Sequence, residues 1–119
     1  MDRTDLARRR DIAARIAQDA ALRAARMRAE GKGVATLKGA QDFLTEADGA
    51  TESTIREALA QAFPGEAILG EEMGGLPQQS GLLWVIDPID GTANFARNAD
   101  RWCVSIGLVQ DGRAVAGAI

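Results

Sequence analysis

Two clusters of acidic residues each come directly after a short apolar run that predicts a buried strand. The first cluster is Glu71-Glu72, and the second is Asp87-Pro88-Ile89-Asp90. In layered α/β proteins, ligands commonly bind at the carboxyl ends of strands. The two clusters are therefore the candidate functional residues of this sequence.

The second cluster predicts a site for a divalent cation. Pro88 fixes its own φ and has no N–H, so the chain is expected to turn tightly at the end of the strand. Such a turn would aim the carboxylates of Asp87 and Asp90 at one point, with the carbonyl of Ile89 beside them. Carboxylate and carbonyl oxygens suit Mg²⁺ or Mn²⁺. If Glu71 joins them, each pair of carboxylates ~5 Å apart repels by about 3 kcal/mol at an effective dielectric constant of ~20, and a divalent cation would relieve this repulsion.

The residues after the second cluster predict a helix that starts at Gly91. The free N–H groups at the start of a helix favour phosphate, and glycine lets the backbone approach a ligand closely. A carboxylate–metal cluster beside such a helix indicates metal-assisted hydrolysis of a phosphoester. A structural interpretation stays open at this point, because an Asp-Pro-x-Asp-Gly segment is often only a turn and two adjacent glutamates are often a solvated pair.

Composition narrows the classes of protein to which the chain could belong. The 119 residues are 46% hydrophobic and 26% charged, which predicts one globular domain. The sequence contains no histidine, which excludes a Ser-His-Asp triad, a Cys-His pair or a histidine base within these residues. Its one cysteine, Cys103, cannot form an internal disulfide, and we interpret it as an inert buried thiol.

Charge and hydropathy indicate a cytoplasmic protein whose main partner is neither a membrane nor a nucleic acid. Residues 1–30 carry eight arginines and five acidic side chains, whereas residues 31–119 carry six basic and twelve acidic side chains. The body of the chain is therefore acidic, and binding to a phosphate backbone needs positive charge. No apolar run approaches the ~20 residues of a membrane span, and the charged N-terminus lacks the apolar stretch of a signal peptide.

Two helices are predicted before the first acidic cluster. One spans residues 5–30, with Thr4 as its N-cap, and the other spans residues 50–63. Their apolar positions recur every four residues: Ile12, Ile16 and Ala20 in the first helix, and Ile55, Leu59 and Phe63 in the second. Each helix is therefore expected to pack one face on a core.

Four strands are predicted after the second helix: residues 67–69, 82–86, 102–109 and 113–119. Asp111-Gly112, between the last two, is a strong signal for a two-residue hairpin. Residues 74–81 are expected to form an exposed loop, and Met73 and Trp84 to pack in the core. This order predicts an α+β or layered α/β fold, in which N-terminal helices pack on a mostly antiparallel sheet.

With these elements in order, the sequence resembles the inositol monophosphatase family of metal-dependent phosphatases from Asp5 to Ile119. The resemblance rests on five segments in the family's order: Lys38 with Asp42, Leu44 to Asp48, Gly70 to Glu72, Asp87 to Phe95, and Trp102 to Leu108. It departs from the family at Gly49, where the family usually has a longer polar residue. The resemblance implies the front part of the inositol monophosphatase-like (sugar phosphatase) fold, as a single domain over residues 1–119 that lacks the C-terminal part of the family fold.

The resemblance also implies which residues bind metal ions. One Mg²⁺ ion, with Mn²⁺ as a possible substitute, would be held by Glu71, Asp87 and the carbonyl of Ile89. A second ion would be shared by Asp87 and Asp90, and Glu71 would touch a third, weaker ion.

For catalysis, the resemblance implies that Asp48 and Thr92 form a hydrogen-bonded pair that helps to activate the attacking water, and that Glu71 is also catalytic. The N–H groups of Gly91 and Thr92, together with Asp90, would bind the phosphate of the substrate.

The implied function is Mg²⁺-dependent, Li⁺-sensitive hydrolysis of a small phosphorylated substrate, myo-inositol monophosphate, by an enzyme that is a homodimer in the full-length family. Nucleotide bisphosphates, histidinol phosphate and sugar bisphosphates stay open as other family substrates. A second hypothesis is a non-catalytic fragment or binding module that pairs with another chain through the strand edge near Ala114 to Ile119. The family supplies a further metal-binding aspartate and substrate contacts beyond residue 119, so we expect this chain alone to bind Mg²⁺ with negligible turnover.

Overall fold

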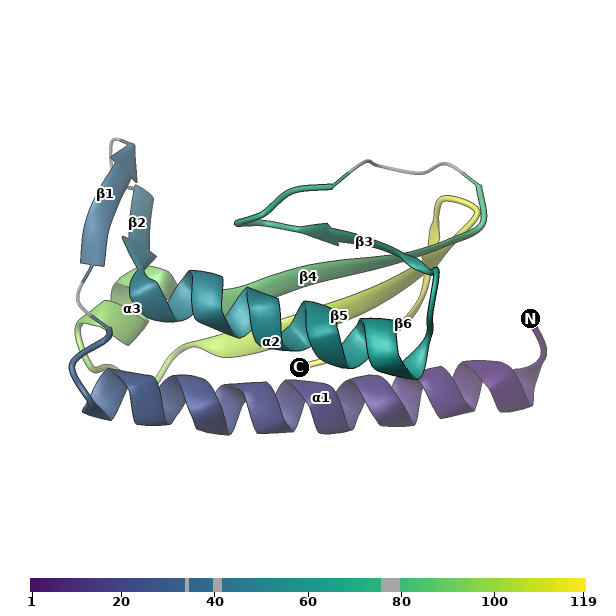
Figure 1. Cartoon of the computed structure of the whole chain (residues 1–119), viewed down its shortest axis with the longest axis horizontal. Helices are drawn as coiled ribbons and strands as arrows, with labels where there is room; N and C mark the ends of the chain where they lie inside the picture. The colour runs from purple at the N-terminus through teal and green to yellow at the C-terminus, as the bar shows by residue number, and fades with distance from the viewer. Residues whose placement is uncertain (34, 40–41, 76–79) are drawn as a thin grey trace.

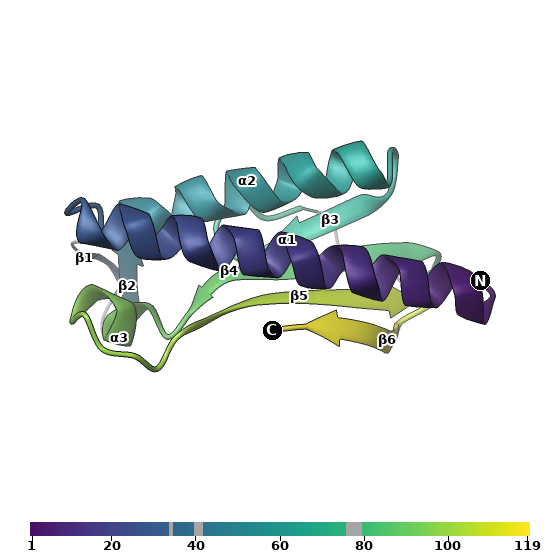
Figure 2. The ribbon, with the colours of Figure 1, turned by 90° about the horizontal axis from the view of Figure 1, so that it is seen from below.

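The computed structural model describes residues 1–33, 35–39, 42–75 and 80–119, with side chains described outside residues 34–44. It has two layers, because two long helices lie on one face of a four-stranded sheet (Figures 1 and 2). A separate two-stranded ribbon and a short helix lie together at one end of the molecule (Figure 1). The predicted α+β arrangement is confirmed.

Helix α1 (Arg3–Ala29) packs through a face of small residues. Its buried positions are all alanines: Ala13, Ala17, Ala20 and Ala24. Because alanine is small, α1 can approach α2 and the sheet closely, and Ile12 and Ile16 pack at the border of this face. The predicted N-cap, Thr4, is wrong. Asp2 caps the helix instead, because its Oδ1 accepts a hydrogen bond from the N–H of Asp5 at 2.8 Å.

Helix α2 (Glu46–Ala62) begins four residues before the predicted start. Thr45 is its N-cap, and the backbone N–H of Thr45 donates a hydrogen bond to the carboxylate of Asp48 at 2.9 Å. This capping-box arrangement starts the helix early in spite of Gly49. The predicted apolar stripe is confirmed, because three of its side chains are buried: Ile55, Leu59 and Phe63.

The four-stranded sheet has the strand order β3-β4-β5-β6 and is mostly antiparallel, as predicted. Its strands are β3 (Ala67–Gly70), β4 (Leu82–Asp90), β5 (Cys103–Gln110) and β6 (Arg113–Ala118). Strands β3 and β4 run parallel, whereas the other two neighbouring pairs run antiparallel. The predicted hairpin joins β5 to β6, and both of its turn residues, Asp111 and Gly112, have positive φ angles of 50° and 81°.

A two-stranded ribbon between α1 and α2 was not predicted. Strands β1 (Ala35–Gly39) and β2 (Asp42–Thr45) pair antiparallel, and the ribbon lies beside the short helix α3 (Thr92–Ala96), as Figure 1 shows. The side chains of Lys38 and Asp42 fall outside the described part of the chain, as do residues 76–79 of the predicted loop.

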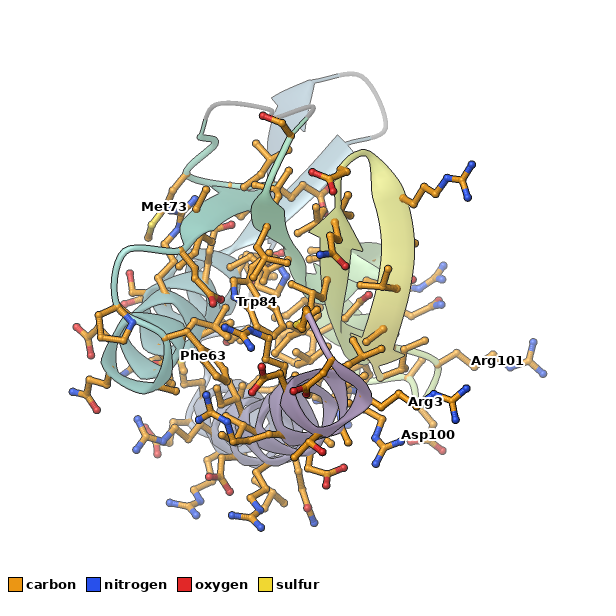
Figure 3. All side chains as sticks on the ribbon, turned by 90° about the vertical axis from the view of Figure 1, so that its right-hand side faces the viewer. Arg3, Phe63, Met73, Trp84, Asp100 and Arg101 are labelled. Carbon is orange, nitrogen blue, oxygen red and sulfur yellow. The ribbon has the colours of Figure 1, made fainter. Side chains whose placement is uncertain are left out.

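Trp84 lies at the centre of the core between the helices and the sheet (Figure 3). Its ring stacks on Phe63 with centroids 5.5 Å apart, and its Nε1 donates a hydrogen bond to Glu66 at 2.7 Å. Trp84 is therefore a core residue, as predicted. Met73 is 51% exposed and lies at the surface (Figure 3), so the prediction that it packs in the core is wrong. Its position in the turn after β3 explains this exposure.

Among the described residues, none of the helices combines the length and the apolar character that crossing a membrane requires.

Candidate functional site

The carboxyl ends of β3 and β4 meet at one edge of the sheet, and the two acidic clusters lie there. The strands are parallel with Gly70 beside Ile86, and the N–H of Glu71 donates to the carbonyl of Ile86 at 3.2 Å. This register brings Glu71 next to Asp87. Both line a pocket of about 380 Å³ formed by residues 69–71, residues 85–87 and Ser105. A larger groove, between α1 and the start of β5, is lined mainly by apolar side chains, so the smaller pocket is the candidate site.

A β-bulge in β4 sets the positions of the second acidic cluster. Asp87 pairs with Ser105 and Asp90 pairs with Cys103, so three steps along β4 match two steps along β5. Pro88 lies inside this bulge, where its missing N–H is tolerated. The strand therefore continues to Asp90, and the predicted tight turn at its end is wrong. The extra residue interrupts the alternation of side chains, which lets two carboxylates three residues apart approach the same region.

Asp87 has an environment that disfavours its charged form. Burial, a hydrogen bond with Glu71 and the negative charges of Glu71 and Asp90 raise the pKa of Asp87 to about 7. Its Oδ1 is buried and accepts no hydrogen bond from any described residue. A partly buried carboxylate beside two others needs a proton or a cation to neutralise it. Asp87 thus interacts with both of the other carboxylates that the sequence singled out, Glu71 and Asp90.

A second polar group joins the start of α2 to the start of α3. Asp48 is fully buried, and its Oδ1 accepts a hydrogen bond from the hydroxyl of Thr92 at 3.0 Å. Its Oδ2 accepts hydrogen bonds from the backbone N–H and the hydroxyl of Thr45. The Thr92 hydroxyl is also 3.0 Å from the carbonyl oxygen of Ile89. Since a hydroxyl has one proton, Thr92 donates to Asp48 or to Ile89 and keeps lone pairs free for another donor.

Gly91 forms the corner between β4 and α3. Its φ of 88° lies in the left-handed region, and a Cβ here would lie 2.8 Å from the carbonyl oxygen of Arg101. Only glycine fits this corner without strain. Helix α3 follows as predicted, and its first turn closes where the N–H of Phe95 donates to the carbonyl of Gly91 at 2.9 Å. The corner therefore fixes Thr92 next to the bulge.

Sequence reasoning missed Glu52, a fully buried residue on α2. Its carboxylate accepts hydrogen bonds from the N–H groups of Glu72 and Met73, each at 2.8 Å. A signal was available in the sequence, because Glu52 comes four residues after Asp48 and three before Ile55, on the face of α2 that packs on the core. A charged residue on such a face is buried only when it has partners.

Cys103 lies at the border of the site, with its Sγ 3.9 Å from Oδ2 of Asp90. It is half-buried rather than fully buried. Burial and the charges of Asp90 and Asp87 raise the pKa of Cys103, which keeps the thiol protonated and weakly nucleophilic. We assign it no part in the chemistry.

Comparison with known proteins identifies the family to which this geometry belongs. A model described as the inositol monophosphatase family matches residues 5–119. The chain belongs to the inositol monophosphatase family. The predicted resemblance is therefore confirmed, and it covers the acidic clusters, the bulge and the Gly91 corner.

Several known proteins resemble the chain in sequence or in structure. The chain is 43% identical over 76 residues to histidinol-phosphatase of Mycobacterium tuberculosis, a match that covers 64% of this chain and 29% of that protein. It is 46% identical over 83 residues to inositol-1-monophosphatase ImpA of Mycolicibacterium smegmatis, covering 70% of this chain and 30% of ImpA. The solved inositol monophosphatase from Anabaena (Nostoc) aligns with a TM-score of 0.75 and 36% identity, covering 95% of this chain and 39% of that structure. The chain therefore spans well under half the length of these relatives.

The inositol monophosphatase family is generally metal-dependent, and the donors at this site have the chemistry that a hard cation requires. In the part of the chain that is described, no three histidine, cysteine, aspartate or glutamate side chains are arranged to hold a metal ion by themselves. The Oδ1 of Asp87, without a hydrogen-bond partner in the described ranges and with Glu71 and Asp90 beside it, nevertheless fits Mg²⁺. Mg²⁺ keeps several waters and needs only one or two carboxylates from the protein.

Proposed function

We propose that this chain carries the divalent-cation site of a phosphomonoester hydrolase. The protein ligands would be the carboxylates of Glu71, Asp87 and Asp90 and the carbonyl oxygen of Ile89. The observation that carries this proposal is the buried Oδ1 of Asp87, which has no hydrogen-bond partner among the described residues, beside two further carboxylates. Mg²⁺, or Mn²⁺ in its place, would supply Lewis-acid polarisation of the phosphate and a lower pKa for the attacking water.

The neighbouring residues would orient the water and the phosphate. The Thr92 hydroxyl donates its proton to Asp48 or to Ile89, so its oxygen can accept a hydrogen bond from a water. Asp48 holds Thr92 in this orientation and can take up the proton that the hydroxyl passes on. We assign the N–H groups of Gly91 and Thr92, at the start of α3 beside the bulge, to phosphate binding.

An inositol monophosphate is the substrate that we propose. The names of ImpA and of the Anabaena enzyme, both similar to this chain, support it. Histidinol phosphate is the second candidate, because a relative with 43% identity is named histidinol-phosphatase. Both compounds are phosphate monoesters of an alcohol, so the same cation site would serve either one, and contacts to the alcohol would distinguish them.

The test of this function is phosphate release by a polypeptide of the family's length that carries residues 1–119 of this chain. With myo-inositol 1-phosphate we expect release that requires Mg²⁺, stops in EDTA and is inhibited by Li⁺. Histidinol phosphate is assayed in parallel, and we expect slower turnover of it. Equal release in EDTA would refute the metal-dependent reaction, whereas faster turnover of histidinol phosphate would replace the proposed substrate and leave the cation site in place.

A further inference from the structure

Glu52 is a buried carboxylate that takes no direct part in the proposed reaction. A buried charge is costly unless it is paired and hydrogen-bonded. Glu52 has such partners: the N–H of Glu72 at 2.8 Å, the N–H of Met73 at 2.8 Å, and Nε of Arg56 at 3.0 Å. Two of these three partners belong to the turn that carries Glu71. The carboxylate of Glu52 therefore links this turn to α2 through hydrogen bonds.

The turn after β3 is built around this carboxylate. It closes on itself through two hydrogen bonds of 2.9 Å between the backbones of Gly70 and Gly74. Arg56, which pairs with Glu52, also donates to the carbonyl of Gly74. At Gly70, a Cβ would lie 2.5 Å from the carboxyl group of Glu52. Glycine at this position therefore makes the room that Glu52 occupies.

One helix connects the two halves of the site. Asp48 and Glu52 are four residues apart on α2, one helical turn, and both are fully buried. Asp48 binds the hydroxyl of Thr92 at the start of α3, and Glu52 binds the turn that follows β3. Because α2 is rigid over one turn, it fixes the start of α3, bound by Asp48, relative to the turn after β3, bound by Glu52.

We propose that Glu52 is a positioning residue, which fixes the turn containing Glu71 so that the carboxylate of Glu71 meets Asp87 and the cation site is assembled before a cation binds. This inference rests on the proposed function of the site. Residues that orient metal ligands without touching the metal typically change metal affinity ten- to a hundredfold when they are replaced.

The variant Glu52→Gln tests this proposal at nearly unchanged side-chain volume. A glutamine has one acceptor oxygen, and its NH₂ group would face at least one of the three donors now bound by Glu52. The matched control is Glu66→Gln. Glu66 is also a mostly buried carboxylate, which accepts hydrogen bonds from Trp84 and Arg9, but it lies before β3, at the opposite end of the strand from the turn.

The measurement is the affinity of the 119-residue chain for Mn²⁺, taken from the EPR signal of free Mn²⁺ at a temperature where all variants are folded. We expect Glu52→Gln to bind Mn²⁺ about tenfold or more weakly than the wild type. Glu66→Gln should lower stability yet keep the wild-type affinity. Equal affinities of Glu52→Gln and the wild type would overturn the proposal, and so would an equal loss in both variants, because that would indicate a general effect of lost stability.

Amide hydrogen exchange without metal separates this inference from the proposed function. In Glu52→Gln we expect faster exchange at the N–H groups of Glu72 and Met73, and no such change in Glu66→Gln. If the wild type binds no Mn²⁺, the proposed function fails. The exchange rates alone then test whether Glu52 positions the turn that contains Glu71. Faster exchange at the N–H groups of Glu72 and Met73 would then support a positioning role for Glu52, and unchanged exchange would refute that role.

Discussion

Replacement of Asp87 by asparagine is expected to abolish the stabilisation of the chain by Mg²⁺. A cation that binds only the folded wild type raises its free energy of unfolding by about 2.7 kcal/mol at a hundredfold excess over the dissociation constant. Asp87→Asn removes the negative charge at the centre of the three carboxylates, so its melting temperature should not change with Mg²⁺. Thermal melts in EDTA and in tenfold steps of Mg²⁺ measure both proteins.

The same substitution is expected to raise stability when no metal is present. The pKa of Asp87 is about 7 in the folded chain against 3.8 for the unperturbed group, so folding favours its protonated form. Protonation of Asp87 therefore stabilises the folded chain. This stabilisation is fully present below about pH 4 and is lost as the pH rises towards and through about 7. In EDTA at pH 8, Asp87→Asn should therefore melt at a higher temperature than the wild type, and the difference should shrink towards pH 4.

Asp19→Asn is the matched control for Asp87→Asn. Asp19 is an exposed residue of α1, so its substitution makes the same change in net charge away from the site. We expect this variant to keep both the Mg²⁺ response and the pH dependence of the wild type. A wild-type Mg²⁺ response in Asp87→Asn, or its loss in Asp19→Asn, would contradict the assignment of Asp87.

Replacement of Asp48 by asparagine is expected to lower the free energy of unfolding by about 1 to 3 kcal/mol, because it removes the buried, charged acceptor of three hydrogen bonds and weakens the cap of α2. The carboxylate of Asp48 accepts hydrogen bonds from the N–H and hydroxyl of Thr45 and from the hydroxyl of Thr92. Asparagine keeps one neutral acceptor oxygen for Thr45, and its NH₂ group then faces Thr92, whose hydroxyl has to donate to Ile89 in place of Asp48. Urea denaturation of both proteins, analysed with a common slope, gives the difference.

The control for this second substitution is Asp111→Asn. Asp111 is an exposed turn residue that accepts one hydrogen bond from the N–H of Gly81 at 2.7 Å. We expect it to cost less than about 1 kcal/mol, since water can replace an exposed partner. If Asp48→Asn costs no more than Asp111→Asn, the network that holds Thr92 does not contribute to the fold as described.

Local patterns predicted most of the helices and strands. The stripe of Ile55, Leu59 and Phe63 and the Asp111-Gly112 turn each carry a strong short-range signal, and both predictions are confirmed. The start of α2 was predicted too late, because Gly49 weakens helix propensity while the bond between Thr45 and Asp48 compensates for it.

Features that depend on contacts between distant segments were not predictable in the same way. The β1–β2 ribbon is a short pair of strands beside α3, and its register depends on pairing that propensity does not reveal. Pro88 indicated a break in β4, but only the pairing with β5 shows a bulge in place of a turn. The spacing of Glu52 from Asp48 and Ile55 indicates a buried position on α2, but the sequence does not reveal that its partners lie in the turn after β3.

If the two acidic clusters form one cation site, Mn²⁺ bound there broadens the amide NMR signals of both clusters together. In the ¹⁵N-labelled 119-residue chain, a small fraction of an equivalent of Mn²⁺ should erase the signals of Glu71, Asp87, Asp90 and Gly91 first. The signals of α1, including Asp11 and Asp19, should stay sharp, and excess Mg²⁺ should restore the lost ones. Broadening centred on another acidic residue such as Asp100, or no selective broadening at all, would show that the two clusters do not form a cation site.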